Sequence, residues 1–272
     1  MLSLAIKALV HGIVEGITEY LPVSSTGHLI LLNEIDALRL PDAFADSFDI
    51  VVQFGAIVAT VLYFWHDLWP WSPRKSREES KATWRLWLLI AIATVPALFF
   101  GLLLKDAIKE HLFNSAVVAT TLFVGGVALL LLERRRREPR VSAESSLTWR
   151  DALLVGLFQC LAMIPGTSRS AATIIGALAI GFARPLAARF SFFLAIPTLT
   201  AAAGYELLSS GLDFSTEEYT ALGVGLVSAF VVSWLVIAGL MRFIQRHDFR
   251  PFGWYRIALA LTVFALIAFG LA

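Results

Sequence analysis

The feature that most constrains this 272-residue chain is that its apolar stretches are of two kinds, continuous and broken. Six stretches are continuous and approach the roughly 20 apolar residues with which a helix crosses a bilayer core. They span 48–65, 86–104, 115–132, 186–209, 219–241 and 254–272. Because 58% of the residues are hydrophobic and only 16% are charged, the chain is more apolar than a soluble domain. We therefore predict an all-α integral membrane protein with six transmembrane helices.

Two further apolar regions, 2–32 and 150–182, are interrupted by glycine, proline, serine and charged residues. Each uninterrupted piece is too short to cross a membrane. Irregular backbone at membrane depth must face protein or a water-filled cavity, because lipid cannot satisfy free N–H and C=O groups. We predict that both regions are re-entrant helical regions that line one internal cavity. We also expect the first apolar stretch to be retained, since neither a basic segment nor a small-residue cleavage site marks it as a signal peptide.

The order of these stretches predicts an internal duplication. Each broken region is followed by three continuous stretches, which is the arrangement of an inverted-topology repeat. We expect a single membrane domain, 1–272, in which residues 1–132 form the first repeat and residues 150–272 form the second.

Basic residues predict the orientation, because short connections rich in Lys and Arg face the cytoplasm. They gather in segments 66–85, 133–150 and 242–256; the second includes Arg134 to Arg137, and the third includes Arg242, Arg246, Arg250 and Arg256. Six crossings then place both termini outside. The first broken region would enter from outside and the second from the cytoplasm, so that the two would meet near the midplane.

The first broken region contains the polar segment Glu15-Gly16-Ile17-Thr18-Glu19-Tyr20-Leu21-Pro22-Val23-Ser24-Ser25-Thr26-Gly27-His28. On a helix, Glu15 and Glu19 would share one face, where like charges repel. A charge inside the bilayer costs about 2.5–3.5 kcal/mol on insertion scales. A divalent cation, an arginine from elsewhere or protonation of one carboxyl would offset this cost. An interfacial helix with two solvated glutamates is the alternative.

Hydroxyl groups follow Pro22 in the same segment. Ser24, Ser25 and Thr26 suit a loop or a helix N-terminus that binds an anion. On a helical turn, His28 could accept the hydroxyl proton of Ser25 while a glutamate orients the imidazole. This pattern favours an activated oxygen nucleophile.

The second broken region contains Pro165-Gly166-Thr167-Ser168-Arg169-Ser170-Ala171-Ala172-Thr173. Arg169 is a cation deep in an apolar stretch, so it must pair with an anion or face a cavity. Its planar guanidinium matches phosphate oxygens in a bidentate manner. Glu15 and Glu19 are its expected protein partners. A purely structural Arg–Glu clamp between the repeats is the alternative, although the surrounding glycine and hydroxyls favour a ligand.

These two segments resemble the two signature sequences of the undecaprenyl-diphosphate phosphatase family, also called the bacitracin-resistance protein family, and the resemblance covers essentially the whole chain. It implies hydrolysis of undecaprenyl diphosphate to undecaprenyl phosphate and inorganic phosphate, which recycles the carrier lipid of peptidoglycan synthesis. It also implies a divalent cation, magnesium or calcium. The site is then expected in the bacterial plasma (inner) membrane, open to the outer, periplasmic side.

The resemblance also implies roles for single residues. Glu15 and Glu19 would hold the metal and the diphosphate, and Glu19 would also orient His28. Ser25 would be the nucleophile and His28 its base, while direct attack by water with Glu19 or His28 as base stays open. Arg169 would hold the phosphoryl oxygens in the transition state. The expected catalytic residues are Glu19, Ser25, His28 and Arg169, and the expected substrate-binding residues are Glu15, Ser24, Thr26, Ser168, Ser170 and Thr173.

Two other functions fit parts of the pattern. Acid-phosphatase-like lipid phosphatases need a catalytic histidine shortly after a Ser-Arg pair, but no histidine occurs between His111 and His247. A polyprenyl-phosphate flippase would also use inverted repeats and broken helices, but it needs no nucleophile paired with a base. Release of inorganic phosphate distinguishes this alternative from the hydrolase.

Composition sets the remaining expectations about partners. With a net charge of +1 and basic residues confined to short connections, the chain is expected to bind no nucleic acid. A single cysteine, Cys160, excludes an intramolecular disulfide and a cysteine metal cluster. A homodimer is possible on the sequence, as is a monomer.

Overall fold

The computed structural model describes residues 3–33, 35, 38, 40–134, 138–210 and 214–270. Within these ranges the chain is helical, and its one β-type contact is an isolated parallel bridge between Val141 and Phe182. The α-helices are α1 (Leu4–Thr18), α2 (Ser25–Asn33), α3 (Asp42–Tyr63), α4 (Trp65–Leu68), α5 (Arg77–Leu112), α6 (Ser115–Arg134), α7 (Trp149–Gln159), α8 (Arg169–Ala179), α9 (Arg184–Ser210), α10 (Thr216–Phe243) and α11 (Arg250–Ala268). Two short 3₁₀ helices, Glu144–Ser146 and Cys160–Met163, lie on either side of α7. The all-α prediction is confirmed for the described residues.

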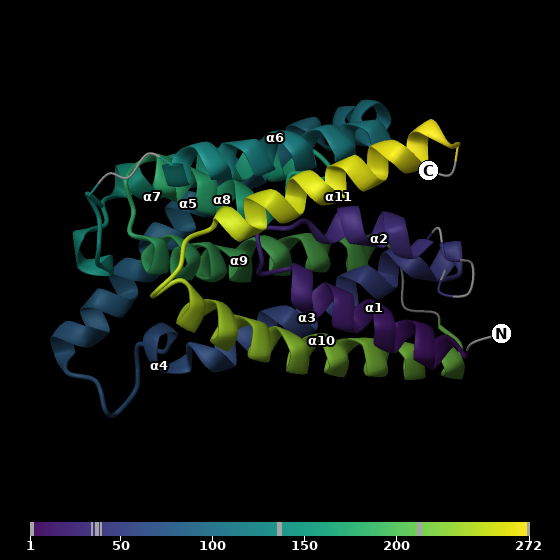
Figure 1. The fold of residues 1–272 in the computed structure, drawn as a ribbon. Helices are drawn as coiled ribbons and strands as arrows, with labels where there is room; N and C mark the ends of the chain where they lie inside the picture. The colour runs from purple at the N-terminus through teal and green to yellow at the C-terminus, as the bar shows by residue number, and fades with distance from the viewer. Residues whose placement is uncertain are drawn as a thin grey trace.

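The long helices run side by side along one axis (Figure 1). α1 packs along α10, α11 packs along α6, and α10 also packs against α3. α1 and α10 approach very closely at Gly12, where a Cβ would lie 2.6 Å from the carbonyl oxygen of Gly225. Small residues permit such approaches between apolar helices. This contact fixes α1 just before the turn that carries Glu15.

Among the described residues, four helices are long and apolar enough to cross a membrane. They are α5 over Arg77–Leu104, α6, α10 and α11. α3 and α9 cover the other two predicted stretches, and the apolar part of α3, Ser47–Tyr63, is shorter. The chain is therefore a multi-pass, all-helical membrane protein.

Both predicted breaks occur. The chain leaves α1 after Thr18 and starts α2 at Ser25, and it leaves α7 after Gln159 and starts α8 at Arg169. Each break contains a proline, which lacks a backbone N–H for a helix. Each ends in a serine with a left-handed backbone, Ser24 with φ 74° and Ser168 with φ 68°. These serines turn the chain back, so each broken region becomes a helical hairpin.

The two hairpins approach the centre of the molecule from opposite ends (Figure 1). The α1–α2 hairpin comes from the end at which α11 finishes. The α7–α8 hairpin comes from the other end, where the bridge from Val141 to Phe182 places the chain before α7 beside the chain after α8. Their tips therefore meet inside the bundle.

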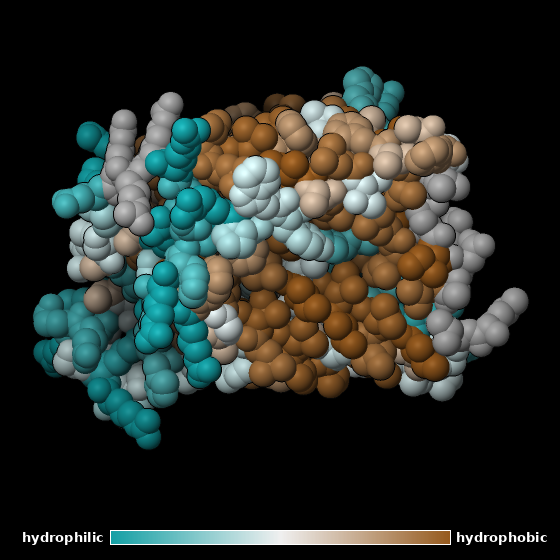
Figure 2. All heavy atoms as spheres, in the orientation of Figure 1, coloured by the Kyte–Doolittle hydropathy of each residue, from teal (hydrophilic) through white to brown (hydrophobic). Residues whose placement is uncertain are grey.

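Hydrophilic residues gather at the end of the molecule that holds α4 and the start of α5, and a broad hydrophobic face follows (Figure 2). The basic segments 66–85 and 133–150 contribute to this polar end, although Arg135, Arg136 and Arg137 lie outside the described residues. Arg256 was predicted to belong to the basic connection 242–256, and this prediction was wrong. Arg256 lies within α11 and is fully buried in the helix bundle, where backbone carbonyls surround its guanidinium.

Candidate functional site

The two hairpins are joined by an ion pair between Arg169 and Glu19. Arg169 is the first residue of α8, and Glu19 follows the last residue of α1. Arg169 Nη2 lies 2.9 Å from Glu19 Oε1, and the two side chains are only 10% and 8% exposed. The other terminal nitrogen, Nη1, donates to the carbonyl oxygen of Ser191 at 2.7 Å. The guanidinium is thus held at the meeting point of the two hairpins.

Several buried polar atoms of the two hairpins have no hydrogen-bond partner among the described residues. They are Glu15 Oε1, Ser24 Oγ and Arg169 Nε. Glu15 also experiences the charges of Glu19 and of Asp49 on α3. Buried polar atoms are nearly always paired, and a cluster of unpaired ones that includes both signs of charge suits a polar ligand. The carboxylate of Asp49 was not predicted as part of this environment.

The hydroxyls of the second hairpin bind protein atoms. Ser168 Oγ caps α8 by accepting from the amide of Ala171 at 3.3 Å, and it lies 3.0 Å from Ser170 Oγ. Ser170 Oγ donates to the carbonyl of Leu21 at 2.9 Å, which ties α8 to the first hairpin. Thr173 Oγ1 lies 2.6 Å from Ser191 Oγ. These contacts position Arg169. Substrate contacts by Ser168, Ser170 and Thr173 stay predictions.

His28 has different partners from those expected. Its Nδ1 lies 2.7 Å from the carbonyl oxygen of Ser24, and its Nε2 lies 2.6 Å from the hydroxyl of Tyr255 on α11. The two rings are stacked, with centroids 5.6 Å apart and planes 8° apart. Glu19 pairs with Arg169 and does not orient this imidazole. The expected contact of His28 with Ser25 is replaced by a contact with a phenol.

Ser25 and Thr26 are the first two residues of α2, and both are half-buried. The amide groups at a helix N-terminus point out of the helix and favour an anion. The turn at Ser24 places these hydroxyls directly after the unpaired Ser24 Oγ in the chain. The start of α2 therefore presents hydroxyls and backbone amides that suit an anion.

Arg256 is a further cation of this region. Its guanidinium donates to four backbone carbonyls: those of Pro22 in the first hairpin, Gly166 in the second, and Thr121 and Leu122 on α6. The side chain is 0% exposed. It therefore holds the proline turn of each hairpin against α6. Arg256 falls within the predicted apolar stretch 254–272, which indicated a buried charge. It was nevertheless predicted to belong to the basic connection 242–256.

Gln159 is the residue of the second hairpin that corresponds to Glu15. It ends α7, is 3% exposed, and has no hydrogen-bond partner for either amide atom among the described residues. It precedes Ser168 by as many residues as Glu15 precedes Ser24. No functional role was predicted for this amide, and the position carries no charge.

A divalent cation fits the acidic side of the site. No group of three His, Cys, Asp or Glu side chains with metal-binding spacing occurs in the part of the chain that the structure describes. Mg²⁺ needs no such group, because it is commonly bound by one or two carboxylates together with substrate phosphates and water. Glu15, with its unpaired Oε1, and the neighbouring Glu19 are the carboxylates that would hold such a cation.

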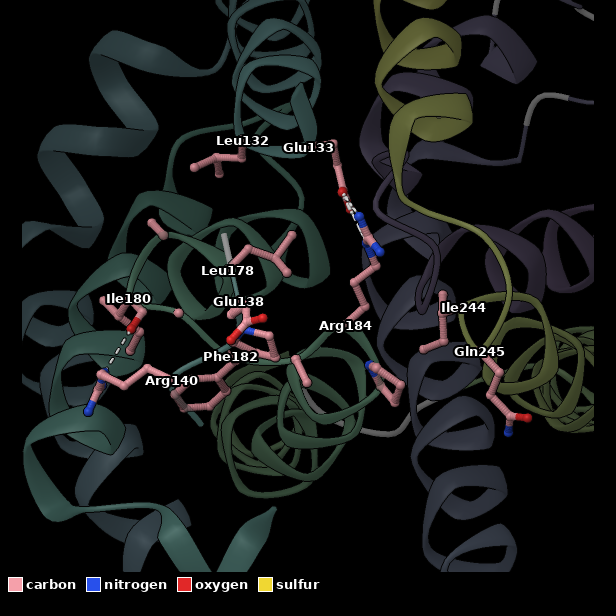
Figure 3. Close-up of a pocket in the computed structure, with 15 residues that line it drawn as sticks. Leu132, Glu133, Glu138, Arg140, Leu178, Ile180, Phe182, Arg184, Ile244 and Gln245 are labelled. Atoms are coloured by element: carbon pink, nitrogen blue, oxygen red, sulfur yellow. Dashed lines mark hydrogen bonds and ion pairs between the residues drawn. The ribbon is translucent and has the colours of Figure 1, made fainter. Parts of the chain in front are cut away.

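A pocket of about 860 Å³ lies elsewhere, at the end of α6 and beside the loop after α8 (Figure 3). Two of its charged side chains are paired, since Arg184 Nε lies 3.0 Å from both carboxylate oxygens of Glu133. Glu133 also accepts from the amide of Phe249 at 3.0 Å. These contacts clamp α6, α9 and the start of α11 together, away from Arg169 and Glu19.

Helical hairpins that meet inside an apolar bundle, around a buried acid–guanidinium pair, define a membrane protein with an internal polar site. Residues 8–262 match the model of the family described as Bacitracin resistance protein BacA, and the chain belongs to that family. A relative from Clostridioides difficile (strain 630), named Undecaprenyl-diphosphatase 1, is 49% identical over 259 residues, which cover 95% of this chain and 94% of the relative. The Undecaprenyl-diphosphatase of Methylococcus capsulatus (strain ATCC 33009 / NCIMB 11132 / Bath) is 47% identical, with 98% of this chain and 96% of the relative covered. The Undecaprenyl-diphosphatase 1 of Oenococcus oeni (strain ATCC BAA-331 / PSU-1) is 45% identical, with 98% of both chains covered.

Proposed function

We propose that this chain is an undecaprenyl-diphosphate phosphatase, which hydrolyses undecaprenyl diphosphate to undecaprenyl phosphate and inorganic phosphate. The observation that carries this proposal is the buried contact of Arg169 with Glu19, which joins two hairpins that also hold the unpaired polar atoms Glu15 Oε1, Ser24 Oγ and Arg169 Nε. The names of the relatives support the same substrate. Hydrolysis of this carrier lipid would confer the bacitracin resistance for which the family is named.

In the proposed reaction the terminal phosphoryl group is transferred from the bridging oxygen of the diphosphate to an oxygen nucleophile. Ser25 Oγ and a water molecule both fit this role. A serine would form a phosphoserine, which water then hydrolyses, whereas water would give inorganic phosphate directly. In both cases the P–O bond to the bridging oxygen breaks and undecaprenyl phosphate leaves. A trapped phosphoserine at Ser25 decides between them.

Arg169 would bind the phosphoryl oxygens and stabilise the charge that they carry in the transition state. Glu19 and Ser191 orient this guanidinium, so little reorganisation is needed when substrate binds. Ser24, Thr26 and the amides at the start of α2 would bind the diphosphate from the other side. This arrangement uses the acid–guanidinium pair as part of the site and not only as a clamp.

Glu15 and Glu19 would hold a divalent cation, Mg²⁺ or Ca²⁺, which would neutralise the diphosphate and polarise its oxygens when bound. The two carboxylates lie in a buried apolar setting in which their mutual repulsion is costly. A divalent cation between the two carboxylates would offset this cost. The positive charge of Arg169, which contacts Glu19, would contribute to the same effect. The unpaired Glu15 Oε1 supports this assignment.

For the membrane arrangement we propose six crossings by α3, α5, α6, α9, α10 and α11. The α1–α2 and α7–α8 hairpins would be the re-entrant regions of two inverted repeats, residues 1–132 and 150–272. The polar end in Figure 2 would face the cytoplasm. Both termini and the opening of the site would then lie on the periplasmic side of the bacterial inner membrane.

The decisive experiment is phosphate release from undecaprenyl diphosphate by the purified protein in detergent. Release is expected with Mg²⁺ or Ca²⁺, its loss with a chelator, and its recovery when the cation is added back. A carrier of polyprenyl phosphate would release no phosphate under any of these conditions, and that result would overturn the proposal. Release that persists in excess chelator would overturn the metal assignment alone.

A further inference from the structure

His28 and Tyr255 make a close side-chain contact for which the proposed reaction has no role. A carbonyl oxygen can only accept, so the 2.7 Å contact with Ser24 places the ring proton of His28 on Nδ1. The neutral imidazole then has its lone pair on Nε2. That lone pair faces the Tyr255 hydroxyl at 2.6 Å, a short distance for a hydrogen bond that the phenol donates.

The geometry of the phenol is fixed from two sides. Its ring stacks on the imidazole with planes only 8° apart. The next residue, Arg256, binds the carbonyls of Pro22 and Gly166, so this turn of α11 cannot move without releasing both hairpins. Tyr255 itself is 46% exposed, at the edge of the bundle. The hydroxyl is therefore held on the basic nitrogen at a position that a ligand from the surroundings can approach.

We infer that Tyr255 is a positioning residue for the reaction: its hydroxyl holds the ring of His28 with Nε2 as the proton-accepting atom. This inference rests on the proposed hydrolase function. Ser24 fixes the tautomer, and Tyr255 fixes the rotation of the ring about its side-chain bonds. Without the phenol, the imidazole keeps its proton on Nδ1 through the contact with Ser24, but the ring can rotate about its side-chain bonds. Nε2 then spends less time in the orientation in which it accepts a proton.

Because the phenol donates to Nε2, a proton that His28 accepts from the attacking O–H group would pass through the phenolic oxygen. As Nε2 takes the phenolic proton, the phenolic oxygen can take the proton of the attacking O–H group. The phenol is neutral before and after this double transfer, and the nucleophile's proton ends, in effect, on Nε2. When the bridging oxygen leaves, the same two transfers run in reverse and deliver a proton to undecaprenyl phosphate. No additional reactant is required.

The test is Tyr255→Phe, which keeps the stacked ring and removes only the hydroxyl. Trp254→Phe is the matched control, because Trp254 is the adjacent aromatic residue of α11 and is 63% exposed. We expect Tyr255→Phe to lower kcat for undecaprenyl diphosphate by about 10- to 100-fold, within the low range of general acid–base effects, with KM changed less than threefold. Trp254→Phe is expected to stay close to the wild-type rate.

A second measurement does not depend on turnover. Diethyl pyrocarbonate acylates unprotonated imidazole nitrogens, and peptide mass spectrometry reports the rate at each of the five histidines. Removal of the hydroxyl from Nε2 should raise the rate at His28 several-fold in Tyr255→Phe, while the rate at His11 stays constant. Wild-type kcat in Tyr255→Phe, an equal loss in Trp254→Phe, or an unchanged acylation rate at His28 would each overturn the inference. If the wild-type protein released no phosphate, the proposed function would fail while the acylation result still tested the contact.

Discussion

The two helical hairpins are built alike and equipped differently. Both turn at a serine with positive φ, Ser24 and Ser168, and both start a new helix at the next residue. In the first hairpin that next residue is Ser25, and in the second it is Arg169. At equal distances in sequence before these two serines stand Glu15 in the first hairpin and Gln159 in the second. A shared backbone therefore presents acids and hydroxyls from one end of the molecule and a cation from the other.

This difference explains why neither hairpin would be sufficient alone. By itself, the first hairpin would hold negative charges that lipid cannot solvate, and the second would hold a cation without a partner. The 2.9 Å contact between Glu19 and Arg169 gives each hairpin part of the counter-charge that it needs. The atoms that it leaves unpaired are the ones available to a ligand, so the asymmetry creates the site. Four substitution experiments test this interpretation.

The largest effect is expected when the contact between the hairpins is removed. Glu19→Gln and Arg169→Ala should each lower turnover at least about 100-fold, as expected for loss of a group that stabilises transition-state charge. Phosphate release and size-exclusion profiles in detergent provide the measurement. Arg169→Lys keeps the charge without the bidentate fork, so it should fall between Arg169→Ala and the wild type.

The double variant Glu19→Gln/Arg169→Gln separates a catalytic pair from a structural clamp. It removes both charges of the pair together, so a protein destabilised by one substitution should regain its fold when both are present. We expect the double variant to be folded and inactive. Recovery of near wild-type turnover would show that the pair serves only to hold the hairpins together.

A smaller effect is expected at the paired positions before the breaks. Glu15→Gln should lower turnover at least tenfold, the equivalent of about 1.4 kcal/mol of transition-state stabilisation, and should raise the concentration of Mg²⁺ needed for half-maximal rate. Gln159→Leu should leave turnover within about threefold, because replacing an unpaired buried amide by an apolar side chain is close to neutral. Comparable losses at the two positions would mean that the second hairpin also contributes to catalysis.

The smallest effects are expected at the two serine turns. Glycine adopts positive φ freely, whereas a residue with a Cβ pays roughly 1–2 kcal/mol there. Ser24→Gly and Ser168→Gly should therefore unfold within a few degrees of the wild type in detergent, whereas Ser168→Ala keeps the strain, loses the α8 cap and should be less stable by about 1 kcal/mol. Only Ser24→Gly is expected to lower turnover several-fold, because Ser24 Oγ is unpaired and Ser168 Oγ is not. Equal turnover in the two glycine variants would contradict the distinction.

Much of this arrangement could be predicted because lipid penalises free polar groups so strongly. Continuous apolar runs indicated the long helices, and prolines with hydroxyl residues indicated the breaks. The contact between Arg169 and Glu19 followed from the cost of leaving either charge alone. These inferences use local composition and a strong energetic rule, and they need no knowledge of how the helices pack.

Packing determined what could not be predicted. Tyr255 reaches His28 across 227 positions of sequence, and nothing in the spacing of aromatic residues in α11 indicates which one faces the first hairpin. Arg256 lay close to a basic connection, so it was grouped with Arg242, Arg246 and Arg250, although the helix had already begun at Arg250. The roles of Ser170 and Thr173 were equally hidden, since a hydroxyl in a motif can bind a ligand or a neighbouring loop.

The four carbonyl contacts of Arg256 have a consequence for biogenesis. During synthesis, residues 4–179 emerge before α11, so the proline turns of both hairpins lack this guanidinium until the ribosome has passed residue 256. Their carbonyls must until then be hydrated or bound by the insertion machinery. Assembly of the site between the two hairpins is thereby delayed until the bundle is nearly complete. A nascent protein interrupted before α11 would contain every signature residue but would lack the arginine that holds the two hairpins in position.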